Sequence, residues 1–166
     1  MAYAEAVFEV AVTYLMQGER GDAQILLGEK LTGLGAGKFV APGGKLEPGE
    51  SARDAAVREV FEEVGITVAA ADLEQVATFD YVFPFRPAWS QRSTAFIARR
   101  WEGEARGSAE LAPAWYSVDA LPLERMWADA RLWLHRVLAG ERIAVECSYA
   151  ADNDSVAAWD ERVAER

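Results

Sequence analysis

Short apolar runs separated by polar turns dominate the beginning of the chain. AVFEVAVTYLM (6–16) and AQILLGE (23–29) are rich in β-branched and aliphatic residues, and the QGERGD between them has turn composition. These segments predict two paired strands. Glycine and proline punctuate LTGLGAGKFVAPGG (31–44), which predicts a loop with at most a short strand around Phe39 and Val40.

A helical pattern follows. Ser51 fits an N-cap with Asp54 three residues later, and Gly65 stands where a C-terminal cap belongs, so we predict a helix over 51–64. At roughly 100° per residue its charged and apolar side chains separate cleanly into two arcs. The apolar arc, predicted to face the core, holds Val57, Val60, Phe61 and Val64. The charged arc opposite holds Arg58, Glu59, Glu62 and Glu63.

More strands and a second helix are predicted downstream. LEQVATFDYVF (73–83), STAFIARRW (93–101), AWYSV (114–118) and RIAVECSY (142–149) predict strands, and ADARLWLHRVLAG (128–140) predicts a helix closed by Gly140. SVAAWDERVAE (155–165) fits either a strand or a helix with Val156, Trp159 and Val163 on one face. The mixed signals and the length predict a single α/β domain over residues 1–166.

Composition narrows the class of protein. Hydrophobic residues make up 51% of the chain, which is typical of a globular protein. The single cysteine, Cys147, excludes an intramolecular disulfide framework and favours a reducing compartment. The first residues lack a basic segment ahead of their apolar run, and no uncharged apolar run is long enough to span a bilayer. We therefore expect a cytoplasmic protein with no membrane partner.

The charge balance also bears on the partner. A formal net charge of −10 argues against a nucleic-acid polymer, which requires a basic face. Glu59, Glu62 and Glu63 are spaced i, i+3 and i+4, where like charges repel at about 0.2–0.5 kcal/mol per pair. A hard cation such as Mg²⁺ removes that cost and brings substrate phosphates as further ligands. The cluster therefore predicts a phosphate-handling metal site.

The spacing around this cluster resembles a family motif. The chain has Gly44, five residues, Glu50, seven residues, Arg58-Glu59-Val60, one residue, Glu62-Glu63, one residue and Gly65-Ile66. This run, 44–66, matches the Nudix box G-x5-E-x7-R-E-U-x-E-E-x-G-U at every specified position. ILLGEKLTGLGAGKF and WYSVDALPLERMW extend the resemblance to the MutT-type branch, the oxidised-purine nucleoside triphosphate diphosphatases (8-oxo-dGTP diphosphatases), over most of residues 5–145.

The resemblance implies a fold and an activity. The fold is the α/β/α sandwich of the Nudix proteins, with a mixed β-sheet between helices. The activity is Mg²⁺-dependent hydrolysis of a nucleoside diphosphate linked to a further group, with Mn²⁺ as a substitute ion. A purine nucleoside triphosphate, oxidised or ordinary, would give monophosphate and pyrophosphate. ADP-ribose and dinucleoside polyphosphates stay open as substrates, as does a non-catalytic nucleotide-sensing module, and the protein is expected to be a monomer or small homo-oligomer.

The resemblance also assigns roles to single residues near the metal. Glu59, Glu62 and Glu63 match metal-binding glutamates, and the Gly44 carbonyl matches a further ligand. Glu110 matches a glutamate outside the box that acts as an extra ligand or as the base for the attacking water, although a solvated loop glutamate is the alternative. With Glu59 and Glu62 it completes the expected catalytic set. Glu50 and Arg58 match a structural pair, and Lys30 matches a basic residue near the phosphates or is a surface lysine.

The base-binding residues match the branch less well. Trp127 matches a tryptophan that stacks on the purine, with a core role as the alternative. Asp129 matches the first of two consecutive aspartates that read the base, but Ala130 stands at the second position. Val40 replaces an asparagine and Phe39 a tryptophan, so we expect weak base discrimination. Phe85, Arg86 or Trp89, from FPFRPAWSQR (83–92), is expected at the substrate mouth.

Overall fold

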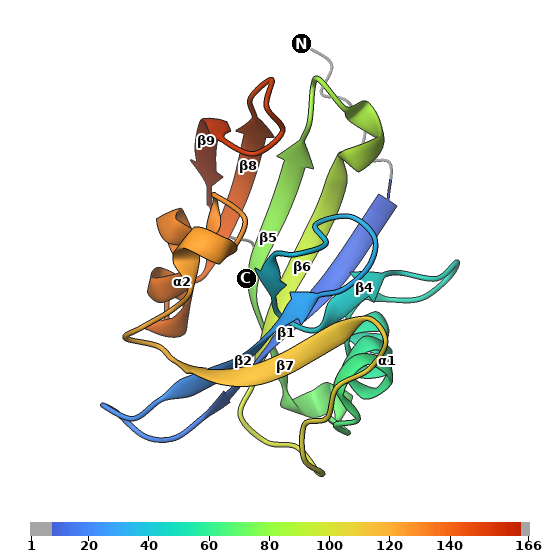
Figure 1. Cartoon of the computed structure of the whole chain (residues 1–166), viewed down its shortest axis with the longest axis vertical. Coiled ribbons are helices and arrows are strands. Elements are labelled where there is room, and N and C mark those ends of the chain that lie inside the picture. The colour runs from blue at the N-terminus through green and yellow to red at the C-terminus, as the bar shows by residue number, and fades with distance from the viewer. Residues whose placement is uncertain (1–7, 164–166) are drawn as a thin grey trace.

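The computed structural model describes residues 8–163 as one mixed sheet with a helix on either side (Figure 1). The strands are β1 (Phe8–Gln17), β2 (Gln24–Lys30), β3 (Phe39–Val40), β4 (Gly43–Lys45), β5 (Leu73–Val82), β6 (Gln91–Ala98), β7 (Leu111–Ser117), β8 (Ile143–Tyr149) and β9 (Val156–Arg162). The helices are α1 (Ala52–Val64) and α2 (Ala130–Leu138). Three short 3₁₀ turns are η1 (Ala70–Asp72), η2 (Pro87–Trp89) and η3 (Leu123–Arg125).

Strand β1 pairs with three other strands, β2, β4 and β6. The order is β3-β2-β1-β6-β5-β8-β9, with β4 also paired to β1 and β7 to β2. The β1–β6 and β5–β8 pairs are parallel and the other pairs are antiparallel. One edge of β1 is shared, because β4 pairs with its middle and β2 with its last two residues. The glycine strand β4 therefore lies close to the centre of the fold.

Two hydrophobic cores lie on opposite faces of this sheet. Tyr14 and Met16 of β1 pack in a cluster with Leu134 of α2, whereas Ala11 and Leu15 pack in another cluster with α1. This alternation follows from the two-residue period of a strand, which sends successive side chains to opposite faces. The expected α/β/α arrangement with a mixed sheet is confirmed.

The helix limits follow the capping signals. At the first end, the Ser51 hydroxyl accepts a hydrogen bond from the Asp54 N–H at 3.1 Å. At the other end, Gly65 adopts a left-handed conformation with φ of 72°, and its N–H donates to the Phe61 carbonyl. The helix predicted over 51–64 is confirmed. The predicted strand pairing of 6–16 with 23–29 and the short strand at Phe39 are also confirmed, although residues 6 and 7 lie outside the described residues.

The predicted division of α1 into a charged face and an apolar face is wrong. Val60 and Val64 are fully buried, but Phe61 is 55% exposed. Glu59 and Glu63 are buried at 8% exposure on the same side as the two valines. This side of the helix faces β4, whose glycines leave room for the two carboxylates. The buried face of α1 therefore contains charged side chains as well as apolar ones.

The remaining differences concern strand limits. Strand β4 was not predicted, because Gly-Gly-Lys has no strand propensity and is ordered by pairing with β1. Strands β6 and β7 begin two and three residues before the predicted segments at 93 and 114. The second helix covers 130–138 of the predicted 128–140.

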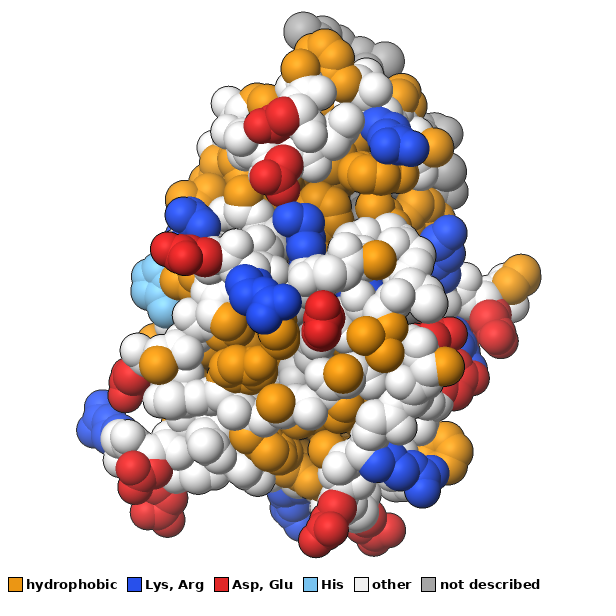
Figure 2. Space-filling model, viewed as in Figure 1, with side chains coloured by type: hydrophobic (Ala, Val, Ile, Leu, Met, Phe, Trp, Pro, Cys, Tyr) orange, Lys and Arg blue, Asp and Glu red, His pale blue; other side chains and the backbone are white. Residues whose placement is uncertain are grey.

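The ambiguous tail is strand β9, which pairs antiparallel with β8; residues 164 and 165 lie outside the described residues. Val156 and Trp159 pack on the core cluster of α2, whereas Val163 is 94% exposed. Neither helix in residues 8–163 has the length and hydropathy to cross a membrane. On the face shown in Figure 2, basic, acidic and apolar side chains of the described residues are interspersed.

We predict that Leu134→Ala lowers the free energy of unfolding by about 2–5 kcal/mol, because Leu134 is fully buried between α2 and the sheet. Leu132→Ala is the matched control on the same helix. Leu132 is 39% exposed, so its loss should cost less than about 1 kcal/mol. Equilibrium denaturant unfolding measures both changes, and equal losses would contradict the core described above.

Candidate functional site

The loop between β4 and α1 is fastened to the helix by one arginine. Arg58 donates from Nε and Nη2 to the two oxygens of Glu50, at 2.8 and 2.7 Å, and from Nη2 to the Lys45 carbonyl at 3.0 Å. The Glu47 N–H also donates to Glu50. The Arg58 hydrogen bonds, followed by that from Glu47, lower the pKa of Glu50 to about 2. The two residues expected to form a structural pair are thus in direct contact.

Three glutamates converge beside this loop. Glu59 and Glu63 lie one turn apart on α1, and Glu110 lies immediately before β7. One carboxylate oxygen from each lies within 4.8 Å of the others. Glu59 accepts a hydrogen bond from Arg58 Nη1 at 2.7 Å, and Glu63 accepts one from the Gly43 N–H at 3.1 Å. This glutamate cluster joins segments about fifty residues apart in the sequence.

Burial and like charge make the cluster favour bound protons. Burial, followed by the nearby Glu59 and Glu110, raises the pKa of Glu63 to about 7, although the Gly43 N–H and Lys30 oppose that change. Burial also raises the pKa of Glu59, despite its hydrogen bond from Arg58. Converging carboxylate oxygens are the ligands that hard divalent cations prefer. The donor set therefore fits such a cation, which would replace the protons and neutralise the repulsion.

Two glycines allow β4 to approach the carboxylates. A Cβ on Gly44 would lie 2.5 to 2.7 Å from the carboxylate atoms of Glu59. A Cβ on Gly43 would lie 2.3 Å from the Ala11 carbonyl oxygen. A side chain at position 43 would collide with the backbone of β1, and one at position 44 would displace the Glu59 carboxylate, so the two glycines allow β4 to pass between β1 and the glutamate cluster.

Glu110 is positioned through its backbone. Its carbonyl accepts a hydrogen bond from the Leu31 N–H at 2.9 Å, and its own N–H donates to the Ser108 hydroxyl at 3.2 Å. The Arg106 N–H donates to the Val64 carbonyl, which ties the same loop to the end of α1. Although exposed, Glu110 is therefore held at the cluster by Leu31, the residue after β2, and by a loop that is tied to the end of α1.

Glu62 lies outside the glutamate cluster. Its side chain is 53% exposed and accepts a hydrogen bond from Arg58 Nη1 at 3.2 Å. The same nitrogen also donates to Glu59. Arg58 therefore links the buried cluster to a carboxylate on the solvent side of the helix.

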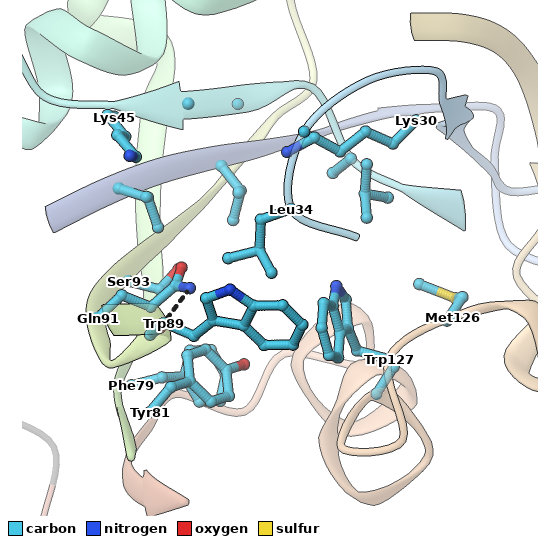
Figure 3. A pocket seen from close by; sticks show the side chains of 18 of the residues that line it. Lys30, Leu34, Lys45, Phe79, Tyr81, Trp89, Gln91, Ser93, Met126 and Trp127 are labelled. Carbon is cyan, nitrogen blue, oxygen red and sulfur yellow. Dashed lines mark hydrogen bonds between the residues drawn. The ribbon is translucent and has the colours of Figure 1, made fainter. Parts of the chain in front are cut away.

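A cleft of about 580 Å³ extends from the glutamate cluster to a group of aromatic side chains (Figure 3). At the acidic end it is lined by Gly44, Glu59, Glu63 and Glu110, and the charge of Lys30 acts on Glu63. Lys45 also lines the cleft, with its amine over the Phe8 ring at 4.4 Å, and no motif in the sequence pointed to it. At the far end the cleft is lined by Phe39, Phe83, Trp89, Trp127 and Asp129, whereas Val40 lines it but packs with the cluster of α1. One cavity therefore contains an anionic and an aromatic end.

Two tryptophans define the aromatic end. Trp89 and Trp127 lie almost perpendicular, at 85°, with ring centroids 6.4 Å apart (Figure 3). Trp89 belongs to the turn after β5, which the Ser90 hydroxyl braces by accepting from the Phe83 N–H at 3.1 Å. Of the three residues that this loop was expected to contribute, Trp89 lines the cleft and Arg86 lies over its ring at 4.4 Å. Phe85 is 66% exposed.

Asp129 is a buried carboxylate with several hydrogen bonds. It accepts from the Tyr81 hydroxyl at 2.7 Å, from Trp133 Nε1 at 2.8 Å and from the Tyr149 hydroxyl. Burial, followed by the charge of Asp129, raises the pKa of both tyrosines, so they remain protonated donors. Tyr81 and Tyr149 belong to β5 and β8, and sequence reasoning did not find them because only the fold brings them to Asp129.

Comparisons with known proteins agree on one family. The NUDIX domain model matches residues 7–137. The chain is 37% identical to an oxidized purine nucleoside triphosphate hydrolase of Danio rerio, over 72% of this chain and 74% of that protein, and 30% identical to its namesake in Mus musculus, over 82% and 85%. The crystal structure of a mutator MutT protein from Bacillus halodurans superposes with a TM-score of 0.75 at 27% identity, covering 95% of this chain and 99% of that one.

We predict that Gly44→Ala weakens Mg²⁺ binding by about 10- to 100-fold, because the new Cβ displaces the Glu59 carboxylate. Isothermal titration of the metal measures the change. Gly107→Ala is the control, since its Cβ would meet its nearest neighbour at an ordinary 3.6 Å. Unchanged Mg²⁺ affinity in a folded Gly44→Ala variant would contradict the glutamate cluster as the metal site.

A second prediction concerns pH. The carboxyl of Glu63 has a pKa of about 7 in the folded protein and an ordinary value of 4.5. Between these values the folded state binds more protons than the unfolded state, so the stability of the metal-free protein falls as pH rises. A cation replaces the Glu63 proton, so the Mg²⁺-induced increase in Tm should be larger at pH 8 than at pH 6.

Thermal unfolding with and without Mg²⁺ at the two pH values measures this difference. In Glu63→Gln the side chain no longer titrates, so the pH dependence of the Mg²⁺ effect should become smaller. An equal Mg²⁺ effect at both pH values in the unmodified protein would rule out proton displacement from Glu63.

Proposed function

Because the chain belongs to the NUDIX domain family of hydrolases, we propose that it cleaves purine nucleoside triphosphates to the monophosphate and pyrophosphate. The observation that carries this proposal is the single cleft that joins the glutamate cluster to Trp127 and Trp89. In a purine nucleoside triphosphate, the phosphates would occupy the acidic end of this cleft and the purine the aromatic end. Two relatives that cover most of the chain are named as hydrolases of oxidised purine nucleoside triphosphates, which supports the same substrate class.

We assign the metal site to Glu59, Glu63 and Glu110, with the Gly44 carbonyl as a further ligand and Mg²⁺ as the ion. When bound, the metal polarises phosphoryl oxygens and lowers the pKa of a coordinated water. Mn²⁺ prefers the same oxygen ligands and serves as a substitute. The protein contributes a preorganised set of carboxylates, and the substrate phosphates complete the coordination.

The proposed roles of the remaining charged residues follow from their positions. Arg58 holds Glu59 in place and keeps Glu62 beside it, so the exposed Glu62 carboxylate is available to a cation that arrives with the phosphates or to the attacking water. Glu110 reaches the cluster from the opposite side and is the alternative proton acceptor. Lys30, whose charge acts on Glu63, is placed to neutralise phosphate charge, and Lys45 is a second cation that lines the cleft.

The aromatic end provides the proposed base site. The partly buried Trp127 lines the cleft and packs against the core, which reconciles the stacking role with the core role expected from the sequence. Phe39 adds an apolar side chain to this end, and Val40 lines the cleft from the side of the α1 cluster. An apolar site selects weakly among bases, so the enzyme should accept several purine triphosphates unless other polar groups read the base.

The experiment that tests this function is a product-resolved hydrolysis screen with Mg²⁺. The substrates are 8-oxo-dGTP, 2-oxo-dATP, the four ordinary triphosphates, ADP-ribose and diadenosine polyphosphates. We expect purine triphosphates to have the highest kcat/KM and to release pyrophosphate. Glu62→Gln should lose at least about 100-fold in kcat without a change in Tm, because it removes one proposed metal or proton acceptor.

Two results would count against the proposal. A higher kcat/KM for ADP-ribose or dinucleotides would move the activity to another substrate of the same family. Full turnover in Glu62→Gln would remove this residue from the catalytic set, and no hydrolysis of any compound by the unmodified protein would favour a nucleotide-sensing module.

A further inference from the structure

The base end of the cleft lacks the polar groups that a selective base site requires. Val40 and Ala130 are apolar at the two positions where the resemblance expects polar base readers. Asp129 is polar, but its carboxylate already accepts three hydrogen bonds from protein donors. A carboxylate offers about four acceptor sites, so Asp129 has little capacity left, and further recognition of a base edge by hydrogen bonds requires other polar side chains that line this cavity.

Strand β6 contributes two such side chains. Gln91 and Ser93 are two residues apart on one strand, so both project from the same face of the sheet. Both line the cleft, beside the indole of Trp89 and below Leu34 and Lys45 in the view of Figure 3. In this view the indole of Trp89 lies between them and Trp127, so the two polar side chains border the aromatic end on the side of Trp89.

Ser93 is a polar side chain on the wall of the cleft. The residue is only 5% exposed, and its hydroxyl makes no side-chain hydrogen bond with another of residues 8–163. The Ser93 oxygen is not one of the fully enclosed unpaired polar atoms of these residues, so it is open to the cleft that it lines. Its hydrogen-bonding capacity is therefore available to a ligand in that cavity.

Gln91 has a fixed orientation. Its Nε2 donates to the Trp89 carbonyl oxygen at 3.2 Å, which is the dashed contact in Figure 3. A backbone carbonyl only accepts, so the amide nitrogen and not the oxygen must face it. Oε1 is therefore left as an acceptor, without a hydrogen-bond donor among the described residues. The side chain presents a defined acceptor instead of an interchangeable amide.

We propose that Gln91 and Ser93 are the base-reading residues of this enzyme, an inference that rests on the proposed function. Gln91 Oε1 accepts from an N–H of the base, and the Ser93 hydroxyl donates to a carbonyl oxygen or ring nitrogen beside it. The ligand class is a purine that carries a donor next to an acceptor on one edge, as guanine does with N1–H and O6. This pair replaces the polar readers that are missing at Val40 and Ala130.

The test compares dGTP with the triphosphate of 2′-deoxy purine riboside, which has ring nitrogens but no exocyclic group and no N–H donor on the base. The unmodified enzyme should prefer dGTP in kcat/KM. Gln91→Met keeps the length of the side chain but removes the amide, and should reduce this preference by about fivefold to tenfold, the effect of one neutral hydrogen bond. The change should appear in KM, because the base is remote from the reacting phosphorus.

Ser93→Ala should reduce kcat/KM for dGTP by a similar factor, about fivefold to tenfold. Ser93→Cys fills nearly the same volume with a weak donor, so a comparable loss in this variant attributes the effect to the hydroxyl and not to a cavity. Thr94→Ala is the matched control. It removes a hydroxyl from the adjacent position of β6, which is not among the residues that line the cleft, and should leave both substrates unaffected.

The outcomes separate the two proposals. If the unmodified enzyme hydrolyses neither triphosphate, the proposed function fails. If it hydrolyses them, and folded Gln91→Met and Ser93→Cys variants retain its kcat/KM values and its preference for dGTP, the assignment of Gln91 and Ser93 is overturned. Tm values equal to that of the unmodified enzyme establish that each variant is folded.

Discussion

The crowding of carboxylates against β4 is the constraint on which the rest of the site depends. Glu59 and Glu63 are buried beside Glu110, where burial and like charge oppose ionisation. Such groups are tolerated only where hydrogen bonds or a cation compensate them. Arg58 and the Gly43 N–H provide part of that compensation, and a divalent cation bound by the three carboxylates would provide more.

Several features of the fold serve this arrangement. The pairing of β4 with the middle of β1 brings Gly43 and Gly44 under α1, and the absence of side chains there lets the carboxylates approach the strand. The Arg58–Glu50 pair fixes the following loop, so α1 begins at a defined place relative to β4. Glu110 then completes the cluster from the start of β7, through backbone contacts with β2.

The cleft combines two kinds of recognition. Its acidic end suits phosphates through a cation, whereas its aromatic end offers Trp89 and Trp127 at right angles. Asp129 is embedded between two tyrosines and Trp133, which makes it part of the framework of this end. Gln91 and Ser93 of β6 line the same cleft and are the proposed base readers. Under that proposal, phosphate chemistry and base selection depend on different elements of the fold.

The sequence by itself determined the elements whose causes are local. The caps at Ser51 and Gly65, the turn glycines and the box spacing act over a few residues, so they indicated α1, most strands and two of the three glutamates of the cluster, Glu59 and Glu63. Tertiary structure decided which side chains of α1 are buried and which distant segments pair, because both depend on elements that are far apart in the sequence. Phe61 is exposed and Glu59 is buried because β4 passes beside the helix, and the tail is a strand because β8 offers a partner. Tyr81, Tyr149 and Ser93 meet the cleft through pairings between distant segments, and a single sequence carries no local signal for such contacts.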